Sequence, residues 1–315
     1  MSLDRRTFLK KSIAAAGVLS FGSAGSLWGS SLNSATNEVS IASLSEPLTT
    51  ISVIKGNDAY AITKRAVDEL GGISKFVKSG QSVVIKPNMG WDRPPQMAAD
   101  TNPDVVRALV EMCKSAGASR IEVFDLTCHN PQRCYKNSGI EDAAKRAGAE
   151  VSFMDKKKFV DYPIPDGKAL KSWPLYKPAM DADVYINVPI AKNHSLSKLT
   201  ICMKNAMGIM GGNRGEIHWN LDQKLADFAT VIKPTLNVVD CTRVLLRNGP
   251  SGGSMKDVDF PRTVLAGTDQ VALDSYTTRF FNMKPADLGY IKAAADMGIG
   301  TMDLDKVKQI NVELS

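Results

Sequence analysis

Lysine, asparagine and histidine recur in this 315-residue chain in two short stretches whose composition suits anion binding and proton transfer. Lysine ammonium and asparagine amide groups donate hydrogen bonds to carboxylate or phosphate. Histidine titrates near neutral pH and can therefore act as a general acid or base. These lysines, asparagines and histidines predict a group of substrate-binding residues and a pair of catalytic histidines. The substrate-binding candidates are Lys86, Asn88, Lys192, Lys204 and Asn205, and the catalytic candidates are His194 and His218.

Three aspartates could complete such a site. Asp125 and Asp240 stand at the ends of strand-like segments, and Asp274 lies one turn into an apolar helical segment. A carboxylate near a histidine or a metal can hold it in the required orientation. We expect Asp240 to belong to the catalytic group. We expect Asp274 to belong to the substrate-binding group, or else to serve the N-terminus of its own helix.

Metal binding is the competing chemistry for the same part of the chain. The possible ligands are His194, His218, Asp125, Cys128, His129 and Asp240. None of them shows a recognised metal-ligand spacing, so a divalent metal is an open alternative and the cofactor is unassigned. The chain contains no phosphate-binding P-loop, no dinucleotide-binding glycine motif and no run of cysteines typical of an iron–sulfur cluster.

The elements that would position these residues alternate between strand-like and helix-like patterns. Such alternation predicts an α/β fold, with a mostly parallel sheet flanked by helices in a single large domain over residues 46–315. Residues 156–177 predict an irregular insertion or hairpin. The predicted strands are 82–86, 120–124, 150–154, 184–188, 236–240 and 263–266, and the predicted helices are 103–116, 140–147, 196–207, 221–232, 272–281 and 286–297.

The ends of the predicted strands locate the site. Ligands of open α/β sheets gather beyond the carboxyl ends of the strands. Lys86 closes one strand, Asp125 follows the next, and Lys192 comes shortly after the strand that ends at Val188. We therefore expect these side chains to lie close together at one edge of the sheet.

The N-terminus predicts export. Arg5-Arg6 is followed by Phe8-Leu9-Lys10 and then by an apolar stretch rich in Ala, Gly and Ser, which is typical of a twin-arginine signal peptide. Residues 1–35 are interpreted as this signal and a flexible lead-in. The expected location is the periplasm or another exported compartment, with the export machinery as a partner and the membrane contacted only transiently.

The net charge and the cysteines of the chain limit which partners and which disulfides can be expected. Residues 1–35 carry four basic residues and one acidic residue, so the net charge of +6 falls to about +3 once they are removed. This excess is too small to predict a nucleic-acid partner. Five cysteines form no Cys-x-x-Cys pair, and Cys128 and Cys134 could form a disulfide in an oxidising compartment.

Short motifs along most of the chain resemble one family. They include Ile85-Lys86-Pro87-Asn88, Ile186-Asn187-Val188-Pro189, Lys204-Asn205 with Gly208, Gly249-Pro250 and Ala272-Leu273-Asp274. The pattern, from about Ile51 to Gly300, resembles that of the family called domain of unknown function 362. Many members resembling this chain carry an appended ferredoxin-type iron–sulfur module, whose cysteines are absent here. The resemblance implies homology without an assigned reaction.

The combined prediction is an exported enzyme that binds a small carboxylate or phosphate substrate. Two alternatives stay open. One is a non-catalytic periplasmic protein that binds a ligand or a metal, and the other is a redox accessory of iron–sulfur proteins, suggested by the modules of the family members.

Overall fold

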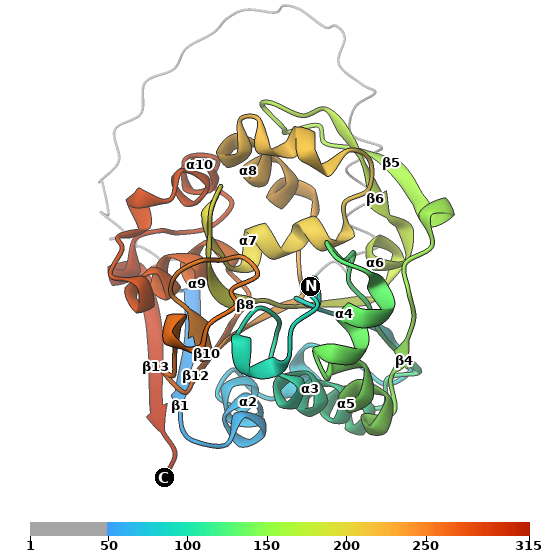
Figure 1. Cartoon of the computed structure of the whole chain (residues 1–315), viewed down its shortest axis with the longest axis vertical. Helices are drawn as coiled ribbons and strands as arrows, with labels where there is room; N and C mark the ends of the chain where they lie inside the picture. Colours follow the sequence, from blue (N-terminus) through green and yellow to red (C-terminus); the bar gives the residue numbers. More distant parts are fainter. Residues whose placement is uncertain (1–48) are drawn as a thin grey trace, which may run out of the picture. The chain divides into compact units, whose positions relative to one another are not determined.

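The computed structural model describes residues 49–315, which form an eleven-stranded sheet covered by helices on both faces (Figure 1). The strand order is β13-β1-β12-β10-β7-β2-β3-β4, with β8, β9 and β11 attached beside β10. The strands are β1 (Thr49–Lys55), β2 (Ser82–Pro87), β3 (Arg120–Val123), β4 (Glu150–Val151), β7 (Val184–Val188), β8 (Ile190–His194), β9 (Lys198–Thr200), β10 (Leu236–Leu245), β11 (Val258–Asp259), β12 (Thr263–Gly267) and β13 (Val307–Glu313).

Most neighbouring strands of the sheet run in the same direction. The pairs β10–β7, β7–β2, β2–β3, β3–β4 and β1–β13 are parallel, whereas β12 runs antiparallel to both β1 and β10. Parallel pairing brings the carboxyl ends of β2, β3 and β7 to the same edge. The predicted fold class, a mostly parallel sheet flanked by helices, is confirmed.

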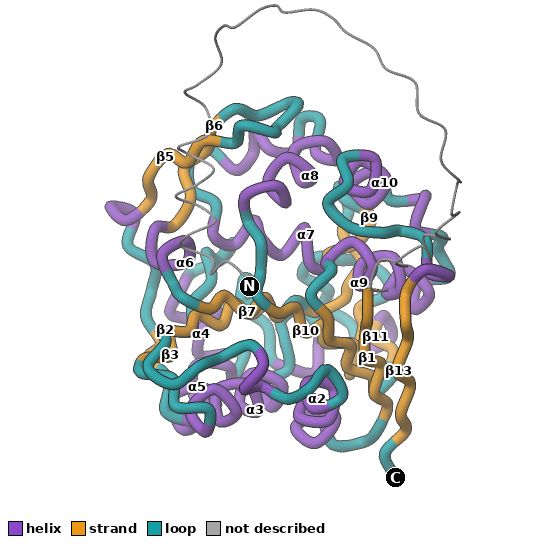
Figure 2. The backbone as a smooth tube through the Cα atoms, turned by 180° about the vertical axis from the view of Figure 1, so that it is seen from behind, coloured by secondary structure: helices purple, strands orange, loops and turns teal. Residues whose placement is uncertain are grey.

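Two layers of helices cover the sheet, as Figures 1 and 2 show from opposite sides. One layer contains α2, α3 and α5, and the other contains α7, α8, α9 and α10. A two-stranded sheet of β5 (Phe159–Pro163) and β6 (Ser172–Tyr176) lies beside the second layer. The helices are α2 (Ala59–Asp68), α3 (Pro103–Ser115), α4 (Pro131–Asn137), α5 (Ile140–Ala147), α6 (Lys177–Asp181), α7 (Cys202–Asn205), α8 (Leu221–Val231), α9 (Gln270–Thr277) and α10 (Gly289–Asp296).

Strand β2 shows how the two layers share the sheet. Val83 and Ile85 pack into the cluster that contains α2, α3 and α5, whereas Val84 packs into the cluster of the opposite layer. Successive side chains of a strand point to opposite faces. Lys86, two residues after Val84, therefore points into the layer that carries α7.

The structure corrects several predicted elements. The helix expected at 196–207 is replaced by strand β9, the single-turn α7 and a 3₁₀ helix at Ala206–Ile209. Strand β8, which carries Lys192 and His194, was not predicted, nor were β1, α2, α4 and β13. The prediction of an insertion or hairpin at 156–177 is confirmed by the pairing of β5 with β6.

The signal peptide and lead-in predicted at residues 1–35 lie outside the described residues, so the structure does not test them. Cys128 and Cys134 are both free thiols, so the disulfide considered from their spacing does not form. None of the helices in residues 49–315 is long and apolar enough to cross a membrane.

Candidate functional site

A cavity of about 410 Å³ opens at the carboxyl ends of β2 and β7, beneath the loop that follows α7. It brings together seven residues that the sequence singled out, from four separate stretches of chain. They are Lys86, Asn88, Lys192, His194, Lys204, Asn205 and His218. Asp125 lines the same cavity and is the only carboxylate in its lining.

Lys86 is held by three acceptors and has no donor left for a ligand. Its Nζ lies 2.8 Å from Asp125 Oδ1, 2.9 Å from Asn205 Oδ1 and 2.9 Å from the carbonyl oxygen of Pro87. An ammonium group has three N–H donors. Burial lowers the pKa of Lys86, and the carboxylate of Asp125 opposes that shift. Lys86 is therefore a structural cation of the cavity wall.

Gly208 allows the wall to close over this ion pair. A Cβ atom at position 208 would overlap the Asp125 carboxylate and the end of the Lys86 side chain. The carbonyl oxygen of Gly208 also accepts a hydrogen bond from the backbone N–H of Leu126 at 3.0 Å. The close approach requires glycine here.

A chain of side-chain amides connects the cations. Asn205 Oδ1 accepts hydrogen bonds from both Lys86 and Asn88 Nδ2, and Asn205 Nδ2 donates to Asn187 Oδ1 at 2.9 Å. Asn187 in turn donates to Asn237 Oδ1 at 2.9 Å. The amides of Asn88 and Asn205 are thus largely occupied within the protein, so they orient the lysines more than they contact a ligand.

Lys192 has one donor left. Its ammonium group donates to Asn88 Oδ1 at 3.0 Å and to the carbonyl oxygen of Ala99, and it lies 5.6 Å from the ring centre of Trp91. Burial lowers its pKa, and the nearby carboxylate of Asp100 opposes that shift. Asp100 lies outside the lining, where its Oδ1 accepts a hydrogen bond from the backbone N–H of Trp91 at 3.0 Å, and burial raises its own pKa to about 7.

Lys204 differs from the other two lysines. It is buried, with 8% of its surface exposed, and it lines the cavity. Within residues 49–315 its ammonium group has neither a hydrogen-bond nor an ion-pair partner. Burial and the positive charges of Lys192, Arg214 and Lys86 lower its pKa to about 8. All three of its N–H donors are available to a ligand.

Arg214 and Trp91 also line the cavity and were not predicted from the sequence, whereas Cys128, which lines it too, was predicted only as a possible metal ligand. Arg214 donates to the carbonyl oxygens of Leu126 and Thr127 at 3.1 and 3.0 Å, which leaves further guanidinium donors free. Arg214 stands in the 3₁₀ helix Arg214–His218. The signal available in the sequence was the cluster of glycines around it, Gly211, Gly212 and Gly215.

The bonds of His194 fix the position of its proton. Its Nδ1 accepts hydrogen bonds from the backbone N–H groups of Leu196 and Ser197 at 3.1 and 3.4 Å. Burial, followed by the charge of Lys204, lowers its pKa to about 3, so the ring is neutral at pH 7. A neutral ring that accepts at Nδ1 carries its proton on Nε2. His194 is therefore a hydrogen-bond donor, and the geometry does not favour the role of a base.

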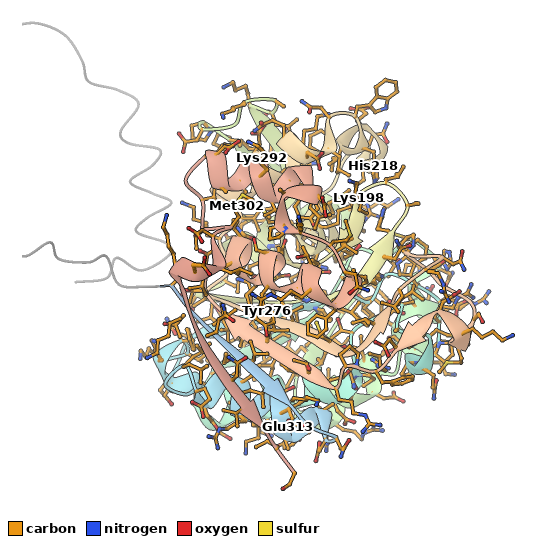
Figure 3. The ribbon with its side chains drawn as sticks, turned by 90° about the vertical axis from the view of Figure 1, so that its left-hand side faces the viewer. Lys198, His218, Tyr276, Lys292, Met302 and Glu313 are labelled. Atoms are coloured by element: carbon orange, nitrogen blue, oxygen red, sulfur yellow. The ribbon has the colours of Figure 1, made fainter. Side chains whose placement is uncertain are left out.

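His218 is the better placed of the two histidines for proton transfer. Its ring lies nearly parallel to that of His194, with 6.4 Å between the ring centres. It is half-buried and lies in the helical layer on one side of the sheet, far from Glu313 at the edge strand (Figure 3). Burial and then Lys204 lower its pKa, which keeps the ring neutral at pH 7 and able to accept a proton.

Asp240 and Asp274 do not line the cavity, which corrects their predicted places in the site. Asp240 accepts hydrogen bonds from the backbone N–H groups of Asn102 and Thr242 at 2.7 and 2.9 Å, so it ties α3 to β10. Asp274 accepts from the backbone N–H groups of Cys202 and Met203 at 2.7 and 3.2 Å. It thereby holds the start of α7, the helix that carries Lys204.

Four of the possible metal ligands, Asp125, Cys128, His194 and His218, line the cavity, whereas His129 and Asp240 do not. Among residues 49–315, no three His, Cys, Asp or Glu side chains are arranged to hold a metal ion. His129 packs edge-on against Trp91, with 4.9 Å between the ring centres. The carboxylate of Asp240 accepts hydrogen bonds from backbone N–H groups at the start of α3 and in β10.

Comparisons with known proteins agree with the motifs. At 26% identity over 257 residues, the chain is similar to the thylakoid-associated protein sll1697 of Synechocystis sp., covering 76% of this chain and 75% of that protein. Among solved structures, it is similar to the lactate racemase apoprotein of Thermoanaerobacterium thermosaccharolyticum, with a TM-score of 0.43 and 13% identity over 72% of this chain. A Thermotoga maritima protein gives a TM-score of 0.39 and 11% identity over 78% of this chain.

The chain spans 56% and 60% of the lengths of those two solved chains. A family model described as "Domain of unknown function (DUF362)" matches residues 83–279, which is more than half of the sequence. The match includes Lys86, Asp125, Lys192, Lys204 and His218. The chain therefore belongs to the DUF362 family.

Proposed function

We propose that this protein binds a small molecule carrying a carboxylate or phosphate group, with Lys204 as the principal anion-binding residue. The observation that carries the proposal is the ammonium group of Lys204, which has no partner within residues 49–315 and belongs to a cavity lined by four cations and one carboxylate. In a largely buried side chain, such a charge interacts more strongly with a partner than it would in bulk water. A bound anion would supply the missing partner through charge-assisted hydrogen bonds.

The remaining donors of the cavity support the same ligand class. Lys192 has one free N–H, and Arg214 keeps donors after bonding to two carbonyl groups. His194 would add the Nε2–H group, and His218 would be the group that accepts or returns a proton. A non-catalytic binding protein would use the same cations without the proton transfer at His218.

The affinity for sulfate tests the proposal through its pH dependence. Sulfate keeps its charge between pH 6.5 and 10, so a change in affinity reports on the protein. Lys204 is charged below its pKa of about 8. We expect nearly constant affinity from pH 6.5 to 7.5 and a loss of about tenfold per pH unit above pH 8, measured by calorimetry.

Other groups that face the cavity must be considered in this titration. They are Lys86, Lys192, Arg214, His194, His218, Asp125 and Cys128. A Cys128→Ser background removes the thiol from the titration. Affinity that stays constant up to pH 10 would show that ordinary surface lysines bind the sulfate, because their pKa values lie near 10.4.

Cys128 offers a chemical probe of the same charge. It is the one exposed cysteine of residues 49–315 and it lines the cavity, whereas Cys113, Cys134, Cys202 and Cys241 are buried. A cationic cavity concentrates anions near the thiol. We expect Lys204→Met to slow alkylation by the anionic iodoacetate several-fold relative to alkylation by the neutral iodoacetamide, followed by mass spectrometry.

An equal effect on both reagents would indicate a change in access to Cys128 or in its thiolate fraction, and would contradict the attraction of anions into the cavity by Lys204. Sulfate should protect Cys128 in the wild-type protein. Lys292→Met is the control, because Lys292 is exposed on α10 (Figure 3) and pairs with Asp296.

We also propose that the protein is exported by the twin-arginine route. The support is the Arg5-Arg6 pair and the apolar stretch that follows it. Replacing both residues by lysine keeps the positive charge, yet it is expected to retain the protein in the cytoplasm. Cell fractionation measures this, and an unchanged distribution between fractions would rule out the twin-arginine route.

A further inference from the structure

Lys204 has an environment suited to a reaction as well as to binding. It is 8% exposed and lines the cavity, and within the described residues no carboxylate or carbonyl oxygen holds the proton of its amine. Lys86, in contrast, has an acceptor for each of its protons. Of these two lysines, only Lys204 can lose a proton without breaking a hydrogen bond within the protein.

We propose that Lys204 acts as a nucleophilic amine and forms an imine with the carbonyl group of a 2-oxo acid held in the cavity. This inference rests on the proposed function, because the carboxylate of the 2-oxo acid would occupy the anion-binding groups. Lysine becomes nucleophilic when it is desolvated or placed beside other cations, and Lys204 meets both conditions.

The cavity also holds groups that could bind the two ends of such a ligand. Arg214 and Lys192 keep free donors for the carboxylate when Lys204 is neutral. The Nε2–H group of His194 would donate to the carbonyl oxygen and so draw electrons from the carbon under attack. His218 would take the proton that Lys204 loses and return it to the departing oxygen.

The step balances without an oxidant or a reductant. The lone pair of Nζ attacks the carbonyl carbon, and the C=O π electrons move to the oxygen, which takes up a proton to give a carbinolamine. His218 takes the remaining N–H proton of the carbinolamine and passes it to that oxygen, the C–O bond breaks and water leaves while the electron pair left on nitrogen forms the C=N bond. The amine and the ketone have then become an imine and one molecule of water.

Reductive trapping tests this step on the full chain. With 2-oxobutanoate and sodium cyanoborohydride, we expect a single carboxypropyl group, mapped by peptide mass spectrometry to Lys204. Lys204→Arg should abolish this adduct, and Lys292→Arg should leave its yield unchanged. Butanone, which has the carbonyl without the carboxylate, should label Lys204 at least several-fold less. Adducts spread over exposed lysines, in the same yield in Lys204→Arg, would overturn the proposal.

Further measurements separate this inference from the proposed function and from misfolding. Butanoate, which has the carboxylate without the carbonyl, should compete with sulfate for the cavity and leave no adduct. Sulfate binding without trapping of 2-oxobutanoate would refute the imine and leave the anion site intact. Failure of sulfate, butanoate and 2-oxobutanoate to bind would refute both. Excess sulfate should suppress labelling of the unaltered protein, and His218→Gln should slow labelling by 2-oxobutanoate several-fold.

Discussion

A Lys204→Met variant is expected to bind sulfate at least about tenfold more weakly than the unaltered protein at pH 7, because hydrogen bonds to charged groups contribute about 1.5–3 kcal/mol each. Lys204 brings three donors that no other described residue uses. Methionine has a similar length and no charge, and its apolar side chain suits the buried position. The measurement is calorimetric titration at low ionic strength.

The controls for this variant distinguish the cavity from the surface. Lys292→Met removes the same charge from an exposed position and should leave sulfate affinity nearly unchanged. Lys86→Met should change stability more than affinity, since the donors of Lys86 are used within the protein. Equal affinity in Lys204→Met and the unaltered protein would exclude Lys204 as the principal binding residue.

Removing the charge of Asp125 is expected to lower the free energy of unfolding by about 3–5 kcal/mol, because it leaves a buried ammonium group without its counter-ion. The side chains of Lys86 and Asp125 are 1% and 3% exposed. Asp125 also accepts a hydrogen bond from the backbone N–H of Met89 at 2.7 Å. Urea denaturation of Asp125→Asn measures the loss.

A double variant tests whether the lost stability belongs to the ion pair. Lys86→Met combined with Asp125→Asn removes both charges, so part of the lost stability should return. The exposed pair Lys177–Asp181 is the matched control, and Asp181→Asn should have little effect. A loss in Asp125→Asn no larger than in Asp181→Asn would contradict the structural role of the buried pair.

The convergence of the site was predictable from the sequence because it depends on strand direction. Parallel strands place their carboxyl ends at one edge, and this principle brings Lys86 and Asp125 together. Lys192 joins them through β8, which pairs with β10 and was not predicted. The residues that follow β2, β3 and β7 could therefore be grouped without knowing any contact. Lys204 and Asn205 joined them through their place in the sequence after Lys192.

The role of each residue depends on contacts in the folded protein, which cannot be inferred from the spacing of residues in the sequence. Asp240 follows the largely apolar stretch 236–239 just as a pocket carboxylate would, yet it accepts a hydrogen bond from the backbone N–H of Asn102 at the start of α3. Asp274 looks like a helix residue that could pair with a cation, but it caps α7 through space. Long-range backbone partners of this kind leave no local pattern in the sequence.

The three predicted anion-binding lysines also could not be distinguished from the sequence. Lys86, Lys192 and Lys204 have the same chemistry. Only the number of ammonium N–H donors that are already bonded within the protein distinguishes a lysine of the cavity wall from a lysine that can bind a ligand. Strand β8 was missed because only one residue, Pro189, separates its start from the end of β7. The helix expected at 196–207 was too long because β9 takes its first half.

Crystals grown with selenate give the most direct test of the central claim, that the cavity binds a small anion at Lys204. The anomalous signal of selenium locates the ion independently of the protein. The account predicts one selenate within hydrogen-bond distance, about 3 Å, of Lys204 Nζ. Selenate found only on the surface, with Lys204 paired to a protein carboxylate, would contradict it.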